Sequence, residues 1–207
     1  MIQKGLTVGL LEVNCYILGD EETKEAVVID PGGDEEKILE ALKYAKLNLK
    51  YIIDTHGHFD HVDANQPLKE ATGAKIAIHE ADAQMLSQPS AEAMFFTGNR
   101  VRVSQADLLL KEDDLISFGP YRLKVLYTPG HTPGSISLVL EGFTYVYVGD
   151  LLFAGSIGRT DFPGGSFDNL IQAVRTKIFP LGDQYSVYPG HGPVTTVGQE
   201  RKYNPFF

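Results

Sequence analysis

Short runs of apolar and β-branched residues, each bounded by Gly, Asp or Pro, dominate the beginning of the chain, and they predict three strands in an opening meander. These strands span residues 2–8, 13–18 and 26–29. The spacing then becomes helical. Asp34 is placed to cap a helix, and Ile38, Leu42 and Ala45 form one apolar stripe along it.

The remaining pattern alternates strands with polar loops and one further helix. The strands are expected at residues 51–55, 121–127, 143–148 and 185–188. Ser166 is placed to cap the helix and Pro180 to end it. Its apolar face consists of Leu170, Ile171, Val174 and Ile178. No linker or low-complexity segment interrupts this order, so we expect an α/β (α+β) fold in a single domain, residues 1–207.

Five of the six histidines follow predicted strands, together with two aspartates. Three histidines and one aspartate fall within the run 55–61, and the others stand singly beside glycine or proline. The seven candidate ligands are His56, His58, Asp60, His61, His131, Asp150 and His191. We expect Gly57 to let the backbone bend tightly, and the glycines beside the single ligands to allow unusual φ values and a close backbone approach. His79 lacks this punctuation and is interpreted as a surface or strand-end residue.

Seven nitrogen and oxygen donors are enough for two divalent metal ions with a position left for water. Zinc is the preferred assignment, and Fe or Mn are accepted by the same ligand types. Two ions that share a water lower its pKa, so the site predicts a metal-bridging hydroxide as nucleophile. Asp60 is a candidate catalytic group that orients this nucleophile or relays its proton, in addition to binding metal.

These motifs resemble the metallo-β-lactamase superfamily, and within it the small glyoxalase II-like hydrolases. Further similarity lies in the runs 14–16 (Asn-Cys-Tyr), 30–32 (Asp-Pro-Gly), 158–163 (Gly-Arg-Thr-Asp-Phe-Pro) and 204–206 (Asn-Pro-Phe). The resemblance implies a four-layer αββα sandwich. It also implies that His56, His58 and His131 hold the first ion, that Asp60, His61 and His191 hold the second, and that Asp150 bridges them.

Glyoxalase II-like chemistry implies a small-molecule thioester substrate such as hydroxyacylglutathione, because a thiolate leaves without a strong general acid. Persulfide dioxygenases, which use a single iron, resemble the chain in the Gly-Arg-Thr-Asp-Phe run and form the alternative. A non-catalytic metal-binding module is a third possibility, and the complete ligand set argues against it.

Two residues and one longer stretch near the predicted site each allow two interpretations. Arg159 either grips a substrate carboxylate or forms a salt bridge with Asp161. Asp54 either fixes the tautomer of a metal-binding imidazole or faces solvent at a strand end. The stretch 87–107, with Met94, Phe95 and Phe96, either covers the pocket as a lid or packs into the core.

Charge, hydrophobicity and cysteine content limit which binding partners and which cellular compartment we expect. A formal charge of -9 argues against a nucleic-acid surface. The longest uncharged run, residues 125–140, contains two prolines and two glycines and is not a membrane helix. The only cysteine, Cys15, is interpreted as a buried strand residue and excludes an internal disulfide. We therefore expect a cytoplasmic protein; the oligomeric state stays open.

Overall fold

The computed structural model describes residues 1–88, 93–95, 98 and 102–207. In this part of the chain, one six-stranded sheet holds its strands in the order β1 to β6. These are β1 (Ile2–Val8), β2 (Val13–Gly19), β3 (Glu25–Ile29), β4 (Asn48–Ile53), β5 (Lys75–His79) and β6 (Leu108–Leu110). The first three strands pair antiparallel, which confirms the predicted meander, and β3 to β6 pair parallel.

A second six-stranded sheet is formed by the later described residues, in the order β14-β13-β10-β9-β8-β7. Its strands are β7 (Leu115–Phe118), β8 (Tyr121–Tyr127), β9 (Ile136–Leu140), β10 (Tyr145–Gly149), β13 (Ser186–Pro189) and β14 (Thr195–Thr196). The short strands β11 (Leu152–Phe153) and β12 (Ser156–Ile157) form a separate hairpin between β10 and β13 in the chain.

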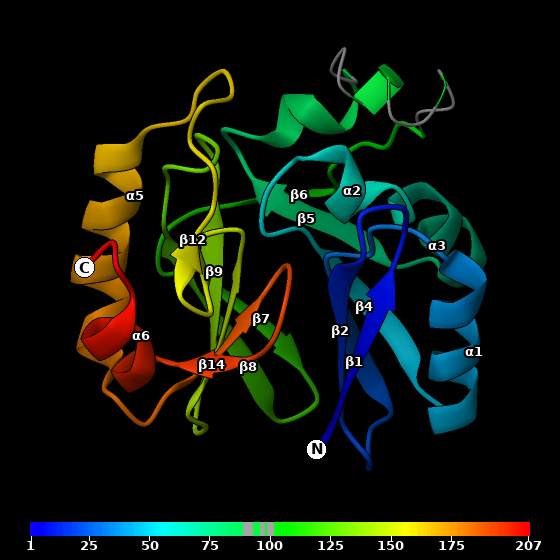
Figure 1. The fold of residues 1–207 in the computed structure, drawn as a ribbon. Helices are drawn as coiled ribbons and strands as arrows, with labels where there is room; N and C mark the ends of the chain where they lie inside the picture. The colour runs from blue at the N-terminus through cyan, green and yellow to red at the C-terminus, as the bar shows by residue number, and fades with distance from the viewer. Residues whose placement is uncertain (89–92, 96–97, 99–101) are drawn as a thin grey trace.

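Helices cover the outer faces of both sheets (Figure 1). On the first sheet lie α1 (Glu35–Ala45), α2 (Phe59–Val62) and α3 (Asn65–Thr72), followed by the 3-10 turn η1 (Ala83–Leu86). On the second lie α5 (Phe167–Ala173), η2 (Val174–Ile178), η3 (Phe179–Leu181) and α6 (Val197–Tyr203). The expected four-layer αββα sandwich is therefore present.

Apolar side chains fill the space between each pair of layers. Leu18 and Ile29 from the first sheet meet Phe118 and Leu123 from the second, and all four are fully buried. Two further clusters lie under the helices, around Ile38 for α1 and under α5 and α6 for the second sheet. Because burial of apolar area drives this packing, the two sheets form a rigid support for the loops at their ends.

Helix caps and ends follow the prediction in part. Ser166 caps α5 as expected, since its hydroxyl accepts a hydrogen bond from the Asn169 backbone N at 3.3 Å. Asp34 occupies the N-cap position of α1, but its side chain accepts from the Gly9 backbone N instead, at 3.1 Å. The predicted helix before Pro180 changes to a π-helical turn after Ala173, so regular α-helix ends earlier than expected.

The stretch 87–107 is described only in part. Met94 and Phe95 are 42% and 82% exposed, so the interpretation that they pack into the core is wrong. Phe96 lies outside the described residues, and the lid stays a prediction. None of the helices in the described residues is long and apolar enough to span a bilayer.

Candidate metal centre

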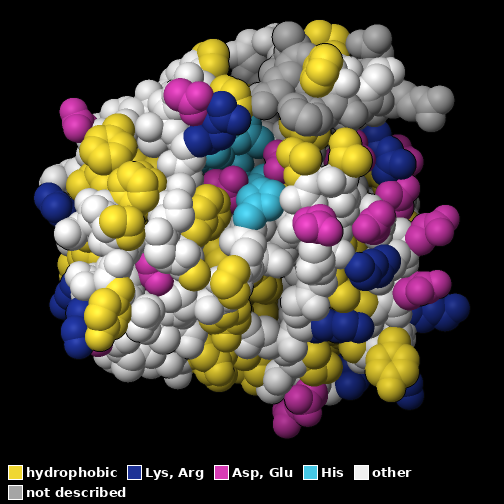
Figure 2. All heavy atoms as spheres, viewed as in Figure 1, with side chains coloured by type: hydrophobic (Ala, Val, Ile, Leu, Met, Phe, Trp, Pro, Cys, Tyr) yellow, Lys and Arg dark blue, Asp and Glu magenta, His cyan; other side chains and the backbone are white. Residues whose placement is uncertain are grey.

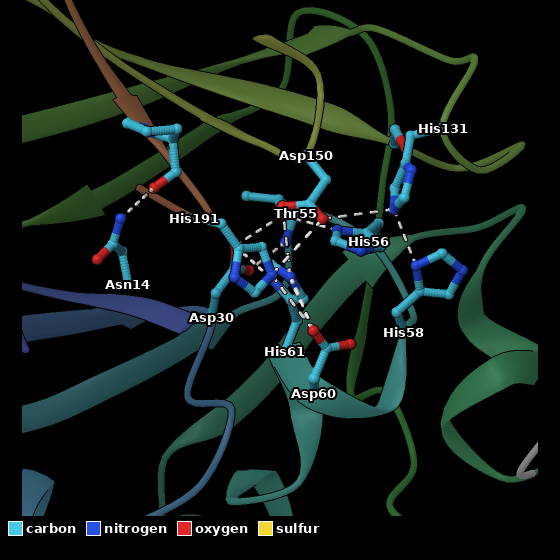
Figure 3. A network of polar contacts seen from close by, with 12 residues as sticks. Asn14, Asp30, Thr55, His56, His58, Asp60, His61, His131, Asp150 and His191 are labelled. Carbon is cyan, nitrogen blue, oxygen red and sulfur yellow. Dashed lines mark hydrogen bonds and ion pairs between the residues drawn. The ribbon is translucent and has the colours of Figure 1, made fainter. Parts of the chain in front are cut away.

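Four chain segments bring the predicted ligands together at one end of the two sheets (Figure 3). The run from His56 to His61 follows β4 in the first sheet and leads into α2. In the second sheet His131 lies in the β8–β9 loop, Asp150 directly follows β10, and His191 lies beyond β13. The candidate site therefore forms where the ends of the two sheets meet.

Each of the seven predicted ligands lies close to other members of the set. The possible ligand atoms form three overlapping groups, each with its atoms within 4.8 Å: His56, His58 and His131; His56, His61 and Asp150; Asp60, His61 and His191. Two of these groups match the ligand sets that the resemblance implies for the first and the second ion. The third links them through Asp150.

Asp150 faces histidines of both sets. Its carboxylate oxygens lie 3.5 Å from His61 Nε2 and 3.7 Å from the Nε2 atoms of His131 and His191. Asp60 Oδ2 lies 3.3 Å from His191 Nε2. One carboxylate is thus placed between two groups of imidazoles, which is the position that a bridging ligand requires.

Several polar atoms in the cluster are buried without a hydrogen-bond partner. They include His56 Nε2, His61 Nε2 and Asp150 Oδ1. A buried polar atom without a partner is costly, and a bound cation would provide the missing interaction. The donor types, imidazole nitrogen and carboxylate oxygen, are those that Zn, Fe and Mn accept. The residues present therefore fit the two metal ions that the sequence predicts.

Hydrogen bonds on the outer side orient three of the imidazoles. His61 Nδ1 donates to Asp30 Oδ2 at 3.1 Å, and His131 Nδ1 donates to the Arg159 carbonyl oxygen at 2.7 Å. Thr55 Oγ1 lies 3.1 Å from His56 Nδ1 and donates its own proton to Asp30 Oδ2. When Nδ1 carries the proton, Nε2 turns its lone pair toward the centre of the site.

Asp30 is the functional residue that the site assignment from sequence missed. It is buried at the end of β3, has a φ of 52°, and also accepts a hydrogen bond from the Thr55 backbone N at 2.7 Å. The sequence shows an Asp-Pro-Gly run after an apolar strand, but nothing in it specifies that the carboxylate faces His61. That contact exists because β3 and β4 are parallel neighbours whose ends meet.

Asp54 takes neither of the two roles predicted for it. It is fully buried, so it does not face solvent, and its Oδ2 accepts a hydrogen bond from Asn65 Nδ2 at 2.7 Å instead of from a histidine. Burial raises the pKa of the Asp54 carboxyl well above its usual value. Asp30, on the neighbouring strand, provides the contact that was expected of Asp54.

For four of the ligands the environment favours the protonation state that binds metal. Burial, reinforced by neighbouring histidines, lowers the pKa of His56 and brings that of His58 to about 4, so both rings are neutral at pH 7. Although burial alone would raise the pKa of Asp60 and Asp150, the facing histidines lower both below the usual value. The two carboxylates are therefore ionised. The pKa values of His61 and His191 are raised instead, because the facing carboxylates of Asp60 and Asp150 outweigh the effect of burial.

Glycines next to the ligands act in two ways. Gly130, Gly149 and Gly192 have φ values of 142°, 52° and 75°, as expected of glycines beside the single ligands, whereas Gly57 and Gly190 make room. Gly57 does not adopt a positive φ, so its backbone conformation does not by itself require glycine. A Cβ at Gly57 would instead lie 2.6 Å from Met85 Cβ, and a Cβ at Gly190 would lie 2.3 Å from Asp150 Oδ1. Side chains at these positions would push the ligand loops apart.

The Asn-Cys-Tyr run holds the loop that carries His191. Asn14 Nδ2 donates to the carbonyl oxygens of Pro189 and Gly192, at 3.1 and 2.8 Å, and Tyr16 Oη donates to Pro189 O at 2.7 Å. Cys15 between them is fully buried, as expected of a strand residue. Residues of the first sheet therefore fix a ligand loop of the second sheet.

Arg159 lies beside the site and is engaged with its own loop. Its Nε and Nη2 donate to the two carboxylate oxygens of Asp161 at 2.9 and 2.8 Å, and its guanidinium lies 3.6 Å from the Phe162 ring centroid. These hydrogen bonds lower the pKa of Asp161 to about 2. The Phe162 ring contacts the His58 ring, with centroids 5.6 Å apart. The salt-bridge interpretation of Arg159 is thus realised in this structure.

His79 lies apart from the donor groups found among the described residues. It ends β5 as expected, but it is buried, not on the surface, and its ring stacks on Tyr127 with centroids 4.5 Å apart. Histidine side chains of the cluster are visible from outside in a hollow between the two halves (Figure 2). The candidate site is therefore open to a small molecule.

Comparison with known proteins agrees with this geometry. The model of the metallo-beta-lactamase superfamily matches residues 8–199. Among curated relatives, hydroxyacylglutathione hydrolase GloC of Haemophilus influenzae is 37% identical over 97% of this chain and 95% of its own length.

Solved structures share the fold over nearly the whole chain. The BLEG-1 B3 metallo-beta-lactamase superposes with a TM-score of 0.93, 36% identity and 99% coverage of both chains. The structure of TTHA1623 in a di-iron-bound form has a TM-score of 0.87 and 34% identity, and the match covers 99% of this chain and 100% of TTHA1623. The structure of ETHE1 from Myxococcus xanthus has a TM-score of 0.82 and 32% identity, and the match covers 99% of this chain and 84% of ETHE1. The chain belongs to the metallo-β-lactamase superfamily, a superfamily of metallo-hydrolases.

Proposed function

We propose that the protein is a binuclear metal-dependent hydrolase of thioesters, of the glyoxalase II type. The observation that carries the proposal is the position of Asp150 between two groups of imidazoles. A site for one ion would not need two donor groups that share a carboxylate. The likeness to hydroxyacylglutathione hydrolase GloC supports a thioester substrate. We place the reaction in the cytoplasm because the chain has one cysteine, buried and free.

His56, His58 and His131 would hold one ion, Asp60, His61 and His191 the other, and Asp150 both. When bound, divalent ions act as Lewis acids that generate a nucleophile from water at neutral pH and polarise a carbonyl group. The protein contributes fixed geometry. Asp30 and the Arg159 carbonyl hold the tautomers of two imidazoles, so no reorganisation of these ligands is needed during the reaction.

Asp60 is the candidate for moving a proton as well as binding metal. Its side chain is 12% exposed, whereas that of His61 is fully buried. The carboxylate is ionised, because the nearby His61 and His191 lower its pKa against the effect of burial. An ionised carboxylate at the edge of the site can accept a proton from a nucleophilic water and pass it to solvent.

A substrate of glutathione size has space beside the site. A cavity of about 770 Å³ adjoins Asp60 and Phe59. Its charged lining consists of Lys37 and Arg102 and of the carboxylates Asp34, Glu35, Glu36, Glu40 and Asp63. This volume is in the range of small-molecule sites. Arg159 is the proposed contact for a substrate carboxylate, which would replace Asp161 in the same two-pronged hydrogen bond.

The proposal is tested by elemental analysis of protein purified without added metal, followed by hydrolysis assays. We expect close to two metal ions per chain and hydrolysis of S-lactoylglutathione. An Asp150→Ala variant, which lacks the bridging carboxylate, serves as the inactive control. A metal content that stays near one after supplementation contradicts the binuclear site.

Persulfide dioxygenase activity is the second candidate, because the Gly158–Phe162 run resembles those enzymes and ETHE1 shares the fold. It predicts one iron per chain and oxygen consumption with glutathione persulfide. The same protein preparation should be assayed for oxygen uptake, and a cephalosporin should be included because of the likeness to BLEG-1. Hydrolysis of the thioester without oxygen uptake supports the first candidate.

A further inference from the structure

A buried carboxylate outside the proposed ligand set joins two of the loops that form the site. Asp82 lies between β5 and η1 and is fully buried. Its Oδ2 accepts hydrogen bonds from the Gly57 backbone N at 3.0 Å and from Thr132 Oγ1 at 2.6 Å. Its Oδ1 accepts one from the Gly134 backbone N at 2.6 Å. One side chain therefore holds two loops that are far apart in the sequence.

These two loops carry the three histidines proposed for the first ion. Gly57 stands between His56 and His58, and Thr132 directly follows His131. His58 Nδ1 and His131 Nε2 are 2.8 Å apart, across the gap between the loops. The separation of the loops consequently decides whether both nitrogens can reach the same ion.

The shape of the loops shows that they are fitted around the Asp82 turn. A Cβ at Gly134 would lie 2.6 Å from Asp82 Cγ, and a Cβ at Gly57 would lie 2.6 Å from Met85 Cβ in the same turn. Each distance is too short for a real carbon contact, so each loop has glycine where the turn approaches it. This explains glycine at two positions where φ does not require it.

Asp82 is a buried carboxylate, which is an unfavourable choice for a residue that only fills space. Among the described residues, no Lys, Arg or His forms an ion pair with it, so hydrogen bonds alone offset the cost of burying its charge. An apolar side chain would fill this space without that cost. What the carboxylate adds is three fixed acceptor contacts to the two ligand loops.

We propose that Asp82 is a positioning residue that sets the separation of the His56–His58 and His131 loops and thereby the affinity of the first metal position. The inference rests on the proposed function, since it concerns one of the two ions assigned there. Asp82 acts through the loops and does not itself bind the metal.

The test compares two variants that affect opposite halves of the site. Asp82→Asn keeps the size of the side chain, but its amide NH₂ must face at least one N–H or O–H donor, so the loops move. Asn14→Ala is the matched control, because Asn14 holds the His191 loop of the second position. Zinc titration of the metal-free proteins gives the two affinities, and anomalous diffraction at one equivalent of zinc shows which position is filled.

We expect Asp82→Asn to weaken the first position by about ten- to a hundredfold, as for other residues that orient metal ligands. At one equivalent, zinc should then lie at Asp60, His61 and His191. Asn14→Ala should show the reverse, with zinc at His56, His58 and His131. An Asp82→Asn protein that melts at a lower temperature but binds both ions as the parent does overturns the proposal.

Thr132→Val provides a second variant if Asp82→Asn does not fold. It removes one of the three hydrogen bonds to Asp82 and retains the shape of the side chain. It should weaken the same position, by less. If the parent protein binds only one ion, the binuclear function fails. The inference about Asp82 is then tested on the affinity of that single ion. It holds if the ion lies at His56, His58 and His131 and the variants lower its affinity, and it fails otherwise.

Discussion

At the scale of single residues, the site depends on contacts that fix side chains before any ligand arrives. Asp150 touches histidines of both sets, and Asp30 holds His61 directly and His56 through Thr55. The two aspartates have different roles. Asp150 lies near the Nε2 atoms that would bind the proposed ions, whereas Asp30 contacts the Nδ1 atom of His61 on the other side of the ring. Their substitution should therefore give different results.

Replacing Asp150 by Ala removes one donor from both ions and leaves two positive charges less screened. We expect metal content to fall to one ion or fewer and thioester hydrolysis to fall by several orders of magnitude. His79→Ala is the control, because His79 packs on Tyr127 away from the ligands. It should melt at a lower temperature yet retain its metal and its activity. Equal loss of metal in both variants would show that the site is misassigned.

Replacing Asp30 by Asn keeps the size of the side chain but exchanges one acceptor oxygen for a donor. His61 Nδ1 and Thr55 then compete for a single oxygen. We expect metal affinity to fall by about ten- to a hundredfold, with activity restored at high zinc concentration. Activity that stays low at saturating zinc would mean that Asp30 does more than orient ligands.

Replacing Arg159 by Ala tests the proposed substrate contact. If the guanidinium exchanges Asp161 for a substrate carboxylate, kcat/KM for a carboxylate-bearing thioester should fall by about 1.5–3 kcal/mol, roughly tenfold to a hundredfold. A small neutral thioester should be hydrolysed equally by both proteins, and metal content should not change. Parallel losses on both substrates, together with a lower melting temperature, would restrict Arg159 to bracing its loop through Asp161.

At the scale of elements, strand ends determine the site, and this part was predictable. Short apolar runs bounded by Gly, Asp or Pro predict the opening meander. The Ser166 cap of α5 and the ligands beyond strands β4, β10 and β13 are where the sequence places them. These features depend on local pattern, which the sequence shows directly. They also explain why all seven ligands meet.

Features that depend on neighbours in space were not predictable. Asp54 and Asp30 both follow apolar runs, and only the pairing of β3 with β4 decides that Asp30 meets His61. The role of Gly57 depends on Met85, which comes from a different loop. Short strands such as β6 and β14 have no clear period of their own, and they form because a longer neighbour offers an edge.

The loop after β13 offers a test at this scale. A Cβ at Gly190 would lie 2.3 Å from Asp150 Oδ1 and 2.6 Å from His61 Cε1. Gly190→Ala should therefore move the loop and lower metal content and activity together. Gly142→Ala is the control: its φ of +80° would be strained by a side chain, but nothing lies within 4 Å of its added Cβ. Gly142→Ala should lower the melting temperature and leave metal binding unchanged. Loss of metal from Gly142→Ala but not from Gly190→Ala would contradict the close packing of the ligand loops.

At the scale of the whole molecule, the ligands come from both sheets. His56, His58, Asp60 and His61 follow a strand of the first sheet, whereas His131, Asp150 and His191 lie on loops of the second. Each proposed ion would therefore connect the two sheets at the end where the core between them stops. Metal binding should contribute to the stability of the whole fold.

Removal of metal tests this connection. An ion that binds the folded but not the unfolded chain stabilises it by about 2.7 kcal/mol at a free concentration of 100 times Kd. Metal-free protein should thus melt at a lower temperature than protein with zinc, and its melting temperature should rise steadily with zinc concentration. In Asp150→Ala the rise should be much smaller, although the apolar core is the same in both proteins. A melting temperature that does not respond to zinc in the parent would show that the ions, if bound, do not hold the two sheets together.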